Sequence, residues 1–70
     1  MLISKKMLYE AVLEVSRTTL WRKMSLYRSE LEEDLFQKRL LSVNEVVIIC
    51  SFFDITKKQV LKKLKKLGKV

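Results

Sequence analysis

Apolar residues recur at helical spacing from the start of the chain. The first set is Met7, Leu8, Ala11 and Val12. These positions share one face of a helix, and Ser4 is a suitable N-cap residue in front of them. The pattern therefore predicts a first amphipathic helix over Lys5–Leu13.

A second helix is predicted after a short break in this pattern. The apolar spacing stops at Glu14-Val15-Ser16, and Ser16 can cap a helix that runs towards Tyr27. Leu20 and Met24 are the apolar positions of that helix. Only three residues separate the first two predicted helices.

Three further helix starts have the form of capping boxes, in which a hydroxyl residue and a Glu or Gln three positions later satisfy each other's backbone donors. These boxes begin at Ser29, Ser42 and Thr56. The helices expected after them contain Leu31, Leu35 and Phe36, then the run Val46–Phe53, then the stripe Val60, Leu64 and Leu67. The run Val46–Phe53 would also suit a strand, but its length and its capping box favour a helix.

The composition narrows the fold class. The 70 residues contain no proline and one glycine, so the usual residues of hairpins and tight turns are missing. That glycine, Gly68, stands where a helix-ending residue with positive φ is expected. The sequence predicts a single all-α domain over residues 1–70, a compact bundle of four to five short helices.

The first two predicted helices have the spacing of a helix-turn-helix over about residues 5–27. This motif lays its second helix in the major groove of DNA, with the residues of its first turns facing base edges. Its inward positions are Leu8, Ala11, Val12, Val15, Leu20 and Met24. The candidate DNA-binding positions are Ser16, Arg17, Thr18, Thr19, Trp21, Arg22 and Lys23.

Three of these candidates have specific expected contacts with bases. Arg17 and Arg22 can pair with O6 and N7 of guanine, and the methyl group of Thr18 can contact a thymine methyl group. Arg22 and Lys23 would otherwise be an ordinary solvated face. Trp21 fits a half-buried packing role as well as a DNA contact, and the sequence leaves both open.

One segment resembles known DNA-binding proteins, namely Leu13-Glu14-Val15-Ser16-Arg17-Thr18-Thr19-Leu20-Trp21-Arg22-Lys23. It is similar to the turn and recognition helix of Fis-type, excisionase-type and phage repressor helix-turn-helix proteins. The later segment Leu41–Thr56 resembles the helices that follow the recognition helix in small phage and mobile-element regulators. These families usually have glycine in the turn, where this chain has Glu14, for which a left-handed conformation is costlier.

The net charge indicates an anionic partner. It is +7, with nucleic acid the first expectation and an acidic membrane surface the second. Seven lysines lie between Lys57 and Lys69, with no acidic residue after Asp54. In a C-terminal helix over about residues 56–67, we expect Lys57, Lys58 and Lys62 to contact phosphates without reading sequence. A solubilising tail or a membrane-surface helix would have a similar composition.

An internal similarity suggests a second helix-turn-helix near the C-terminus. Residues 13–24 align with residues 53–64, with acidic, β-branched, hydroxyl, basic and apolar positions in the same order. The simpler explanation is that any capped amphipathic helix after a short turn has this pattern. Both interpretations stay open at the level of sequence.

Four acidic residues form a patch between the second and fourth predicted helices: Glu30, Glu32, Glu33 and Asp34. Phosphate would repel them, so this patch is expected to face away from DNA. Acidic residues also suit a helix N-terminus, and they could instead dock a basic partner.

Catalysis, metal binding and cofactor binding are not expected. The chain has no histidine, and its one cysteine, Cys50, lies in an apolar run typical of a buried core. Too few nitrogen and sulfur ligands exist for a zinc site. No apolar stretch reaches the roughly 20 residues that cross a bilayer, and the first residues lack signal-peptide features. The expected location is the cytoplasm of a bacterial cell, on the nucleoid.

These features predict a sequence-specific regulator of phage or mobile-element type that binds double-stranded DNA. One recognition helix reads only a few base pairs, so a second motif in this chain, a homodimer or a protein partner is expected. The alternative is a small helical protein-interaction module that binds a polymerase, recombinase or other protein without reading DNA.

Overall fold

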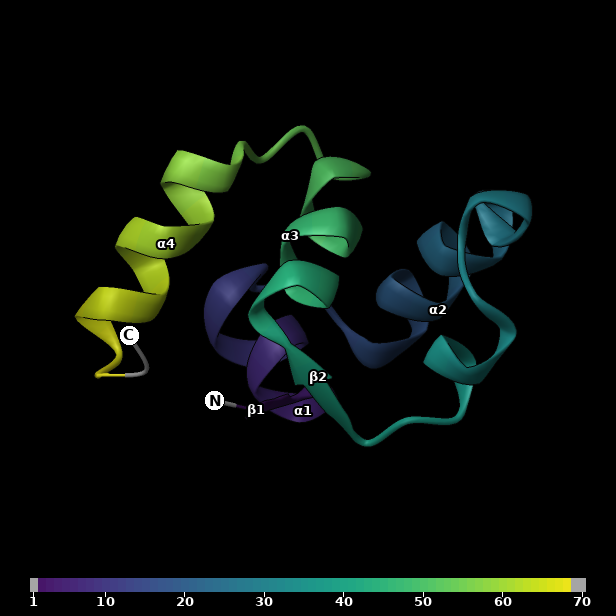
Figure 1. The fold of residues 1–70 in the computed structure, drawn as a ribbon, viewed down its shortest axis with the longest axis horizontal. Coiled ribbons are helices and arrows are strands. Elements are labelled where there is room, and N and C mark those ends of the chain that lie inside the picture. The colour runs from purple at the N-terminus through teal and green to yellow at the C-terminus, as the bar shows by residue number, and fades with distance from the viewer. Residues whose placement is uncertain (1, 69–70) are drawn as a thin grey trace.

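The computed structural model describes residues 2–68, which are mostly helical with one small sheet (Figure 1). The elements in chain order are β1 (Leu2–Ser4), α1 (Lys5–Met7), the π-helical turn η1 (Leu8–Val12), α2 (Arg17–Leu26), the 3₁₀ turns η2 (Arg28–Glu30) and η3 (Glu33–Phe36), β2 (Leu40–Ser42), α3 (Val43–Ser51) and α4 (Lys57–Lys66). Figure 1 shows α2 and α4 towards opposite ends of the long axis, with α3 between them.

All four α-helices of the described residues begin at a hydroxyl side chain, as predicted. The hydroxyl oxygen accepts a hydrogen bond from the backbone N–H three residues later: Ser4 from Met7 (3.0 Å), Ser16 from Thr19 (3.1 Å), Ser42 from Glu45 (3.2 Å) and Thr56 from Gln59 (3.2 Å). The boxes at Ser42 and Thr56 are complete, because Glu45 and Gln59 accept from the N–H groups of Ser42 and Thr56. Each cap satisfies donors that the first helical turn would leave unpaired.

The helix predicted after Ser29 does not form. The chain makes the two short turns η2 and η3, and Leu31 between them is extended, with φ −114° and ψ 148°. A continuous helix would place Glu30 on the same face as Glu33 and Asp34, and like charges at this spacing repel. The irregular path still buries Leu31, Leu35 and Phe36.

The first helix ends in a π-helical turn, which is wider than the α-helix that the sequence predicts. The N–H of Leu13 donates to the carbonyl of Leu8 at 2.8 Å, a five-residue spacing that defines η1 as π-helical. The N–H of Val15 then donates to the carbonyl of Tyr9 at 2.8 Å and closes the turn. The predicted helix over Lys5–Leu13 is therefore present as α1 and η1 together.

The sheet is absent from the sequence prediction, so the all-α class is correct only as a mostly helical fold. β1 and β2 pair antiparallel, with Ile3 opposite Leu41, and both of these side chains are buried. Each strand leads directly into a capped helix, from Ser4 into α1 and from Ser42 into α3. The sheet thus holds the starts of two helices side by side.

Two helix–loop–helix segments of the chain share two local features, forty residues apart. Glu14 and Asp54 have φ of 55° and 61°, and no other non-glycine residue described has positive φ. The hydroxyl caps Ser16 and Thr56 follow two residues later. The similarity seen in the sequence is therefore also present in the backbone.

The two segments share one core and contact each other reciprocally. The buried positions of α2, Leu20 and Met24, match those of α4, Val60 and Leu64. From α4, Nζ of Lys63 donates to the carbonyl of Val12 at 2.8 Å. From the equivalent position of α2, Nζ of Lys23 lies 5.5 Å from the centre of the Phe53 ring. α4 therefore contacts the end of η1, and α2 contacts the turn that follows α3.

The backbone angle or burial predicted for five individual residues is confirmed for some of them and not for others. Gly68 has φ 75°, and Cys50 is buried, as expected. Leu67, predicted as part of the buried stripe of α4, is 41% exposed, because that helix ends at Lys66 and the stripe with it. Ala11 and Val15, predicted to face inward, are partly buried.

Candidate nucleic-acid interface

The outer face of α2 carries most of the candidate DNA-binding residues. Arg17, Thr18, Thr19 and Arg22 are exposed, while Leu20 and Met24 hold the opposite face in the core. The positive φ at Glu14 reverses the chain just before the Ser16 cap. The turn thereby leaves the first two turns of α2 open to a partner.

Ser16 has a structural role that limits it as a ligand. Its Oγ accepts from the N–H of Thr19 and lies 2.9 Å from Oγ1 of the same threonine. The hydroxyl is therefore engaged in capping, and Thr19 is tied to it. Among the candidates at the start of α2, Arg17 and Thr18 have side chains with no such bond among the described contacts.

The structure of Trp21 is compatible with both roles that the sequence left open, a packing residue and a surface contact. It is 39% exposed, and its ring lies 5.7 Å from that of Phe36, tilted by 43°. Nζ of Lys5 lies 5.8 Å from the centre of the indole ring. The residue both packs on the body of the protein and presents part of its ring at the surface.

Lys23 is less available than predicted, because it is partly buried and its Nζ lies over the Phe53 ring. The predicted α4 contacts are more accessible. Lys57, Lys58 and Lys62 are exposed, whereas Lys63 bonds to the carbonyl of Val12. These three lysines match Arg17, Thr18 and Arg22 of α2 at the forty-residue offset.

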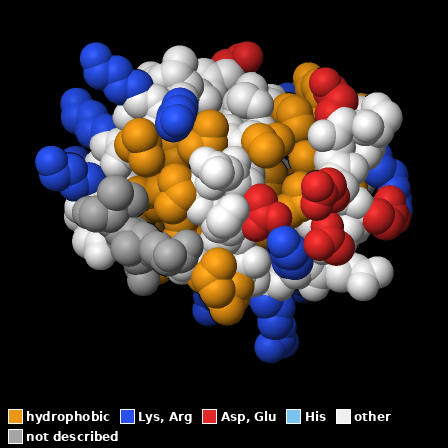
Figure 2. All heavy atoms as spheres, viewed as in Figure 1, with side chains coloured by type: hydrophobic (Ala, Val, Ile, Leu, Met, Phe, Trp, Pro, Cys, Tyr) orange, Lys and Arg blue, Asp and Glu red, His pale blue; other side chains and the backbone are white. Residues whose placement is uncertain are grey.

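Charge is distributed unevenly over the surface. In Figure 2 blue side chains gather at the α4 end of the molecule and red ones at the opposite end. All three ion pairs found among the described residues involve Arg28 or Lys38, so Arg17 and Arg22 have no carboxylate partner there. The exposed cations of α2 and α4 are thus free to meet an external anion.

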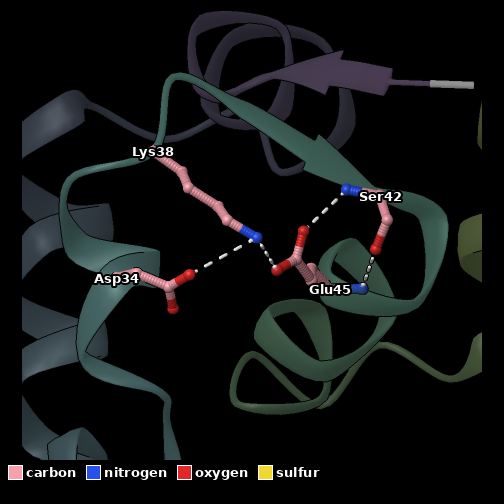
Figure 3. Close-up of polar contacts among 4 residues, drawn as sticks. All are labelled: Asp34, Lys38, Ser42 and Glu45. Atoms are coloured by element: carbon pink, nitrogen blue, oxygen red, sulfur yellow. Dashed lines mark hydrogen bonds and ion pairs between the residues drawn. The ribbon is translucent and has the colours of Figure 1, made fainter.

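Lys38 anchors the acidic patch to the start of α3 (Figure 3). Its Nζ lies 2.8 Å from Oε2 of Glu45 and 3.7 Å from Oδ2 of Asp34. The hydrogen bond between Lys38 and Glu45 raises the pKa of the ammonium group and lowers the pKa of the carboxyl group. This cluster keeps Lys38 occupied within the fold.

Three cations near Arg17 were not singled out from the sequence. Lys5, Lys6 and Arg39 line the same cleft as Arg17 and Trp21. Arg39 is twenty-two residues away from Arg17 in the chain, and the pairing of β1 with β2 brings its backbone to Lys5, whose N–H donates to the Arg39 carbonyl at 3.0 Å. No linear spacing in the sequence could have indicated this group.

The described residues give few other sites. Burial raises the pKa of the Cys50 thiol to about 11, so it stays protonated at neutral pH. No group of three or more Cys, Asp or Glu side chains in residues 2–68 is arranged to hold a metal ion. Every helix in that range is too short or too polar to cross a membrane.

Comparison with models of protein families, with curated proteins and with solved structures finds no match for this chain.

Proposed function

We propose that this protein is a sequence-specific regulator of phage or mobile-element type that binds double-stranded DNA, with α2 as the recognition helix of a helix-turn-helix. The observation that carries this proposal is the turn before α2. Positive φ at Glu14 and the cap at Ser16 present Arg17, Thr18 and Arg22 on an exposed helix start. Such residues contact base edges when a helix of this kind lies in the major groove.

The basic helix α4 contributes phosphate contacts in this proposal. Lys57, Lys58 and Lys62 are exposed and have no carboxylate partner among the described ion pairs. Lysine recognises phosphate as a point charge without reading sequence, and each such contact releases counterions from DNA. Binding should therefore weaken steeply as salt increases.

The size of the molecule sets how it can occupy a site. Its longest extent is 30 Å between Cα atoms, whereas successive major-groove segments on one face of DNA are about 34 Å apart. The helices α2 and α4 of one chain are too close to lie in two successive grooves. A site with two half-sites therefore needs a second copy of the chain or a protein partner.

The test is a selection of bound sequences from random duplexes, followed by salt titration. Arg17→Ala should relax preference at one base pair by about 1–3 kcal/mol, while Lys62→Ala should weaken all sequences alike and lower the salt slope by about one. Arg28→Ala is the control, because Arg28 pairs with Glu33 in the acidic patch. If the wild type enriches no sequence and binds duplex no better than heparin, the proposal is wrong.

A protein-interaction module is the second candidate, and one observation favours it. Leu26 is 76% exposed and lines a shallow apolar hollow with Trp21 on α2. Exposed apolar residues in a group are typical of protein-binding surfaces. Thr18 and Arg22 of the proposed DNA-binding face line the same hollow. Leu26→Ala keeps both of these polar side chains and removes only an apolar contact, so it should weaken binding to a protein partner more than binding to DNA.

A further inference from the structure

A cleft beside the start of α2 gathers positive charge from three parts of the chain. It encloses about 420 Å³, and its charged lining residues are Lys5, Lys6, Arg17, Lys38 and Arg39. No carboxylate of the described residues lines it. Lys38 is held by Glu45, but the other four cations are in none of the described ion pairs.

Cations that line one cleft without a carboxylate among them attract an anion. Burial lowers the pKa of Lys5, which shows that its charge is only partly solvated. Like charges that converge on one space also repel each other. A bound phosphate group would offset both effects, since lysine attracts it as a point charge and arginine can bond two of its oxygens.

Three aromatic residues also line the cleft. Tyr9, Trp21 and Phe36 line it, with Trp21 still 39% exposed. A planar base can stack on an exposed aromatic ring such as that of Trp21, whatever the identity of the base. The volume falls within the range of about 300–1,000 Å³ typical of small-molecule sites.

We propose that this cleft binds one unpaired nucleotide, with its phosphate near Lys5, Arg17 and Arg39 and its base against Trp21. Within a duplex, a base is stacked and paired, and extracting it breaks both interactions. The ligand is therefore a nucleotide of a single strand or a free mononucleotide. The cleft shares Arg17 and Trp21 with the proposed duplex interface of α2. Lys5 and Arg39 belong to the cleft alone, so their variants test this inference separately from major-groove binding.

Trp21 is the one tryptophan of the sequence, so its fluorescence reports on the cleft directly. The probes are thymidine 5′-monophosphate, a short oligothymidylate, inorganic phosphate and thymidine. We expect saturable quenching by the monophosphate or the oligomer at lower concentrations than by phosphate or thymidine. Tighter binding of the oligomer identifies a single strand as the source, and equal binding identifies the free nucleotide.

Variants of the cleft provide the decisive comparison. Arg39→Ala and Lys5→Ala should each raise the Kd for the nucleotide probe about tenfold or more, equivalent to the loss of one charge-assisted bond. Lys65→Ala removes the same charge from the exposed face of α4, and its Kd should be unchanged. Circular dichroism checks that each variant folds, and Arg39 is exposed enough for its variant to keep the fold.

Three results would overturn this inference. The first is the absence of saturable quenching by either nucleotide probe, and the second is wild-type affinity in both cleft variants. The third is quenching by duplex DNA only, which would instead support Trp21 as part of the proposed duplex interface. Filter binding of labelled oligothymidylate to Trp21→Phe and Trp21→Ala checks the stacking. The phenylalanine variant keeps an aromatic ring, so it should bind the oligomer more tightly than the alanine variant.

Discussion

Glu14 and Asp54 share one backbone conformation, with φ of 55° and 61°, at equivalent positions of two helix–loop–helix segments. The N–H of the following residue bonds back to the preceding helix in both, from Val15 to Tyr9 (2.8 Å) and from Ile55 to Cys50 (3.1 Å). A left-handed residue with these bonds ends a helix and redirects the chain. This relationship fixes where α2 and α4 begin.

Glycine at position 14 should stabilise the protein. An L-residue in the left-handed region costs about 1–2 kcal/mol, and glycine's extra chain entropy offsets about 0.5–1 kcal/mol of the gain. Glu14→Gly should thus raise the free energy of unfolding by about 0.5–1 kcal/mol in urea titrations. Glu10→Gly, in the exposed face of η1, is the control and should lower it by about 1 kcal/mol. Equal destabilisation by both variants would contradict this description of the turn.

The Glu45 carboxylate should make stability depend on pH in the acid range. Its pKa lies below the usual 4.5, chiefly because Lys38 donates a hydrogen bond to the charged form. The stabilisation is therefore present above pH 4.5 and lost as the pH falls through the lowered pKa. Glu45→Gln should be less stable than wild type at neutral pH, with a difference that shrinks in acid.

Glu33→Gln is the matched control for that experiment. Glu33 pairs with Arg28, but both side chains are largely exposed, and exposed pairs contribute little. Urea unfolding across the acid range should show a pH-dependent difference from wild type for Glu45→Gln and none for Glu33→Gln. If the free energy of unfolding of Glu45→Gln differed from that of wild type by the same amount at every pH, the charge of Glu45 would not contribute to stability.

Lys63 should stabilise the contact between the two helical segments. Its Nζ donates to the Val12 carbonyl at 2.8 Å, at the end of η1. Lys63→Ala should lower the free energy of unfolding by about 1 kcal/mol, the usual contribution of one such bond. Lys66→Ala removes an exposed lysine of the same helix and should have almost no effect. Indistinguishable unfolding midpoints for the two variants would argue against this contact.

Substitutions on the two faces of α2 should affect different properties. A change on the buried face should lower stability, and a change on the exposed face should weaken DNA binding. Leu20 is buried, so Leu20→Ala should cost about 2–5 kcal/mol through lost burial and a cavity. Arg22 is exposed, so Arg22→Ala should stay within about 0.5 kcal/mol of wild type and lose DNA affinity. Thermal unfolding measures the first effect and duplex titration the second. A large loss of stability in Arg22→Ala would remove it from the candidate interface.

Local features of the fold could be predicted from the sequence, and long-range ones could not. The caps at Ser4, Ser16, Ser42 and Thr56 join residues three positions apart, so a short pattern contains all their information. The pairing of Ile3 with Leu41 joins distant parts of the chain through strands of three residues. Such short strands have too little alternation to be recognised.

The capping box at Ser29 does not begin a helix, because the packing of nearby apolar side chains favours a different backbone path. Burial of Leu31 in an extended conformation removes the helix that the box would begin. The candidate site likewise has one part that follows from the local sequence and another that depends on long-range pairing. The exposure of Arg17, Thr18 and Arg22 follows from helical periodicity, whereas the position of Arg39 beside Lys5 depends on the sheet.

Methylation interference distinguishes a recognition helix in the major groove from binding in the minor groove. Guanine N7 faces the major groove, so a methyl group there should prevent wild-type binding at one or two positions of the selected duplex. Arg17→Ala should become insensitive to methylation at one of these positions. If N7 methylation has no effect, and methylation of adenine N3 in the minor groove prevents binding, α2 is not the recognition helix.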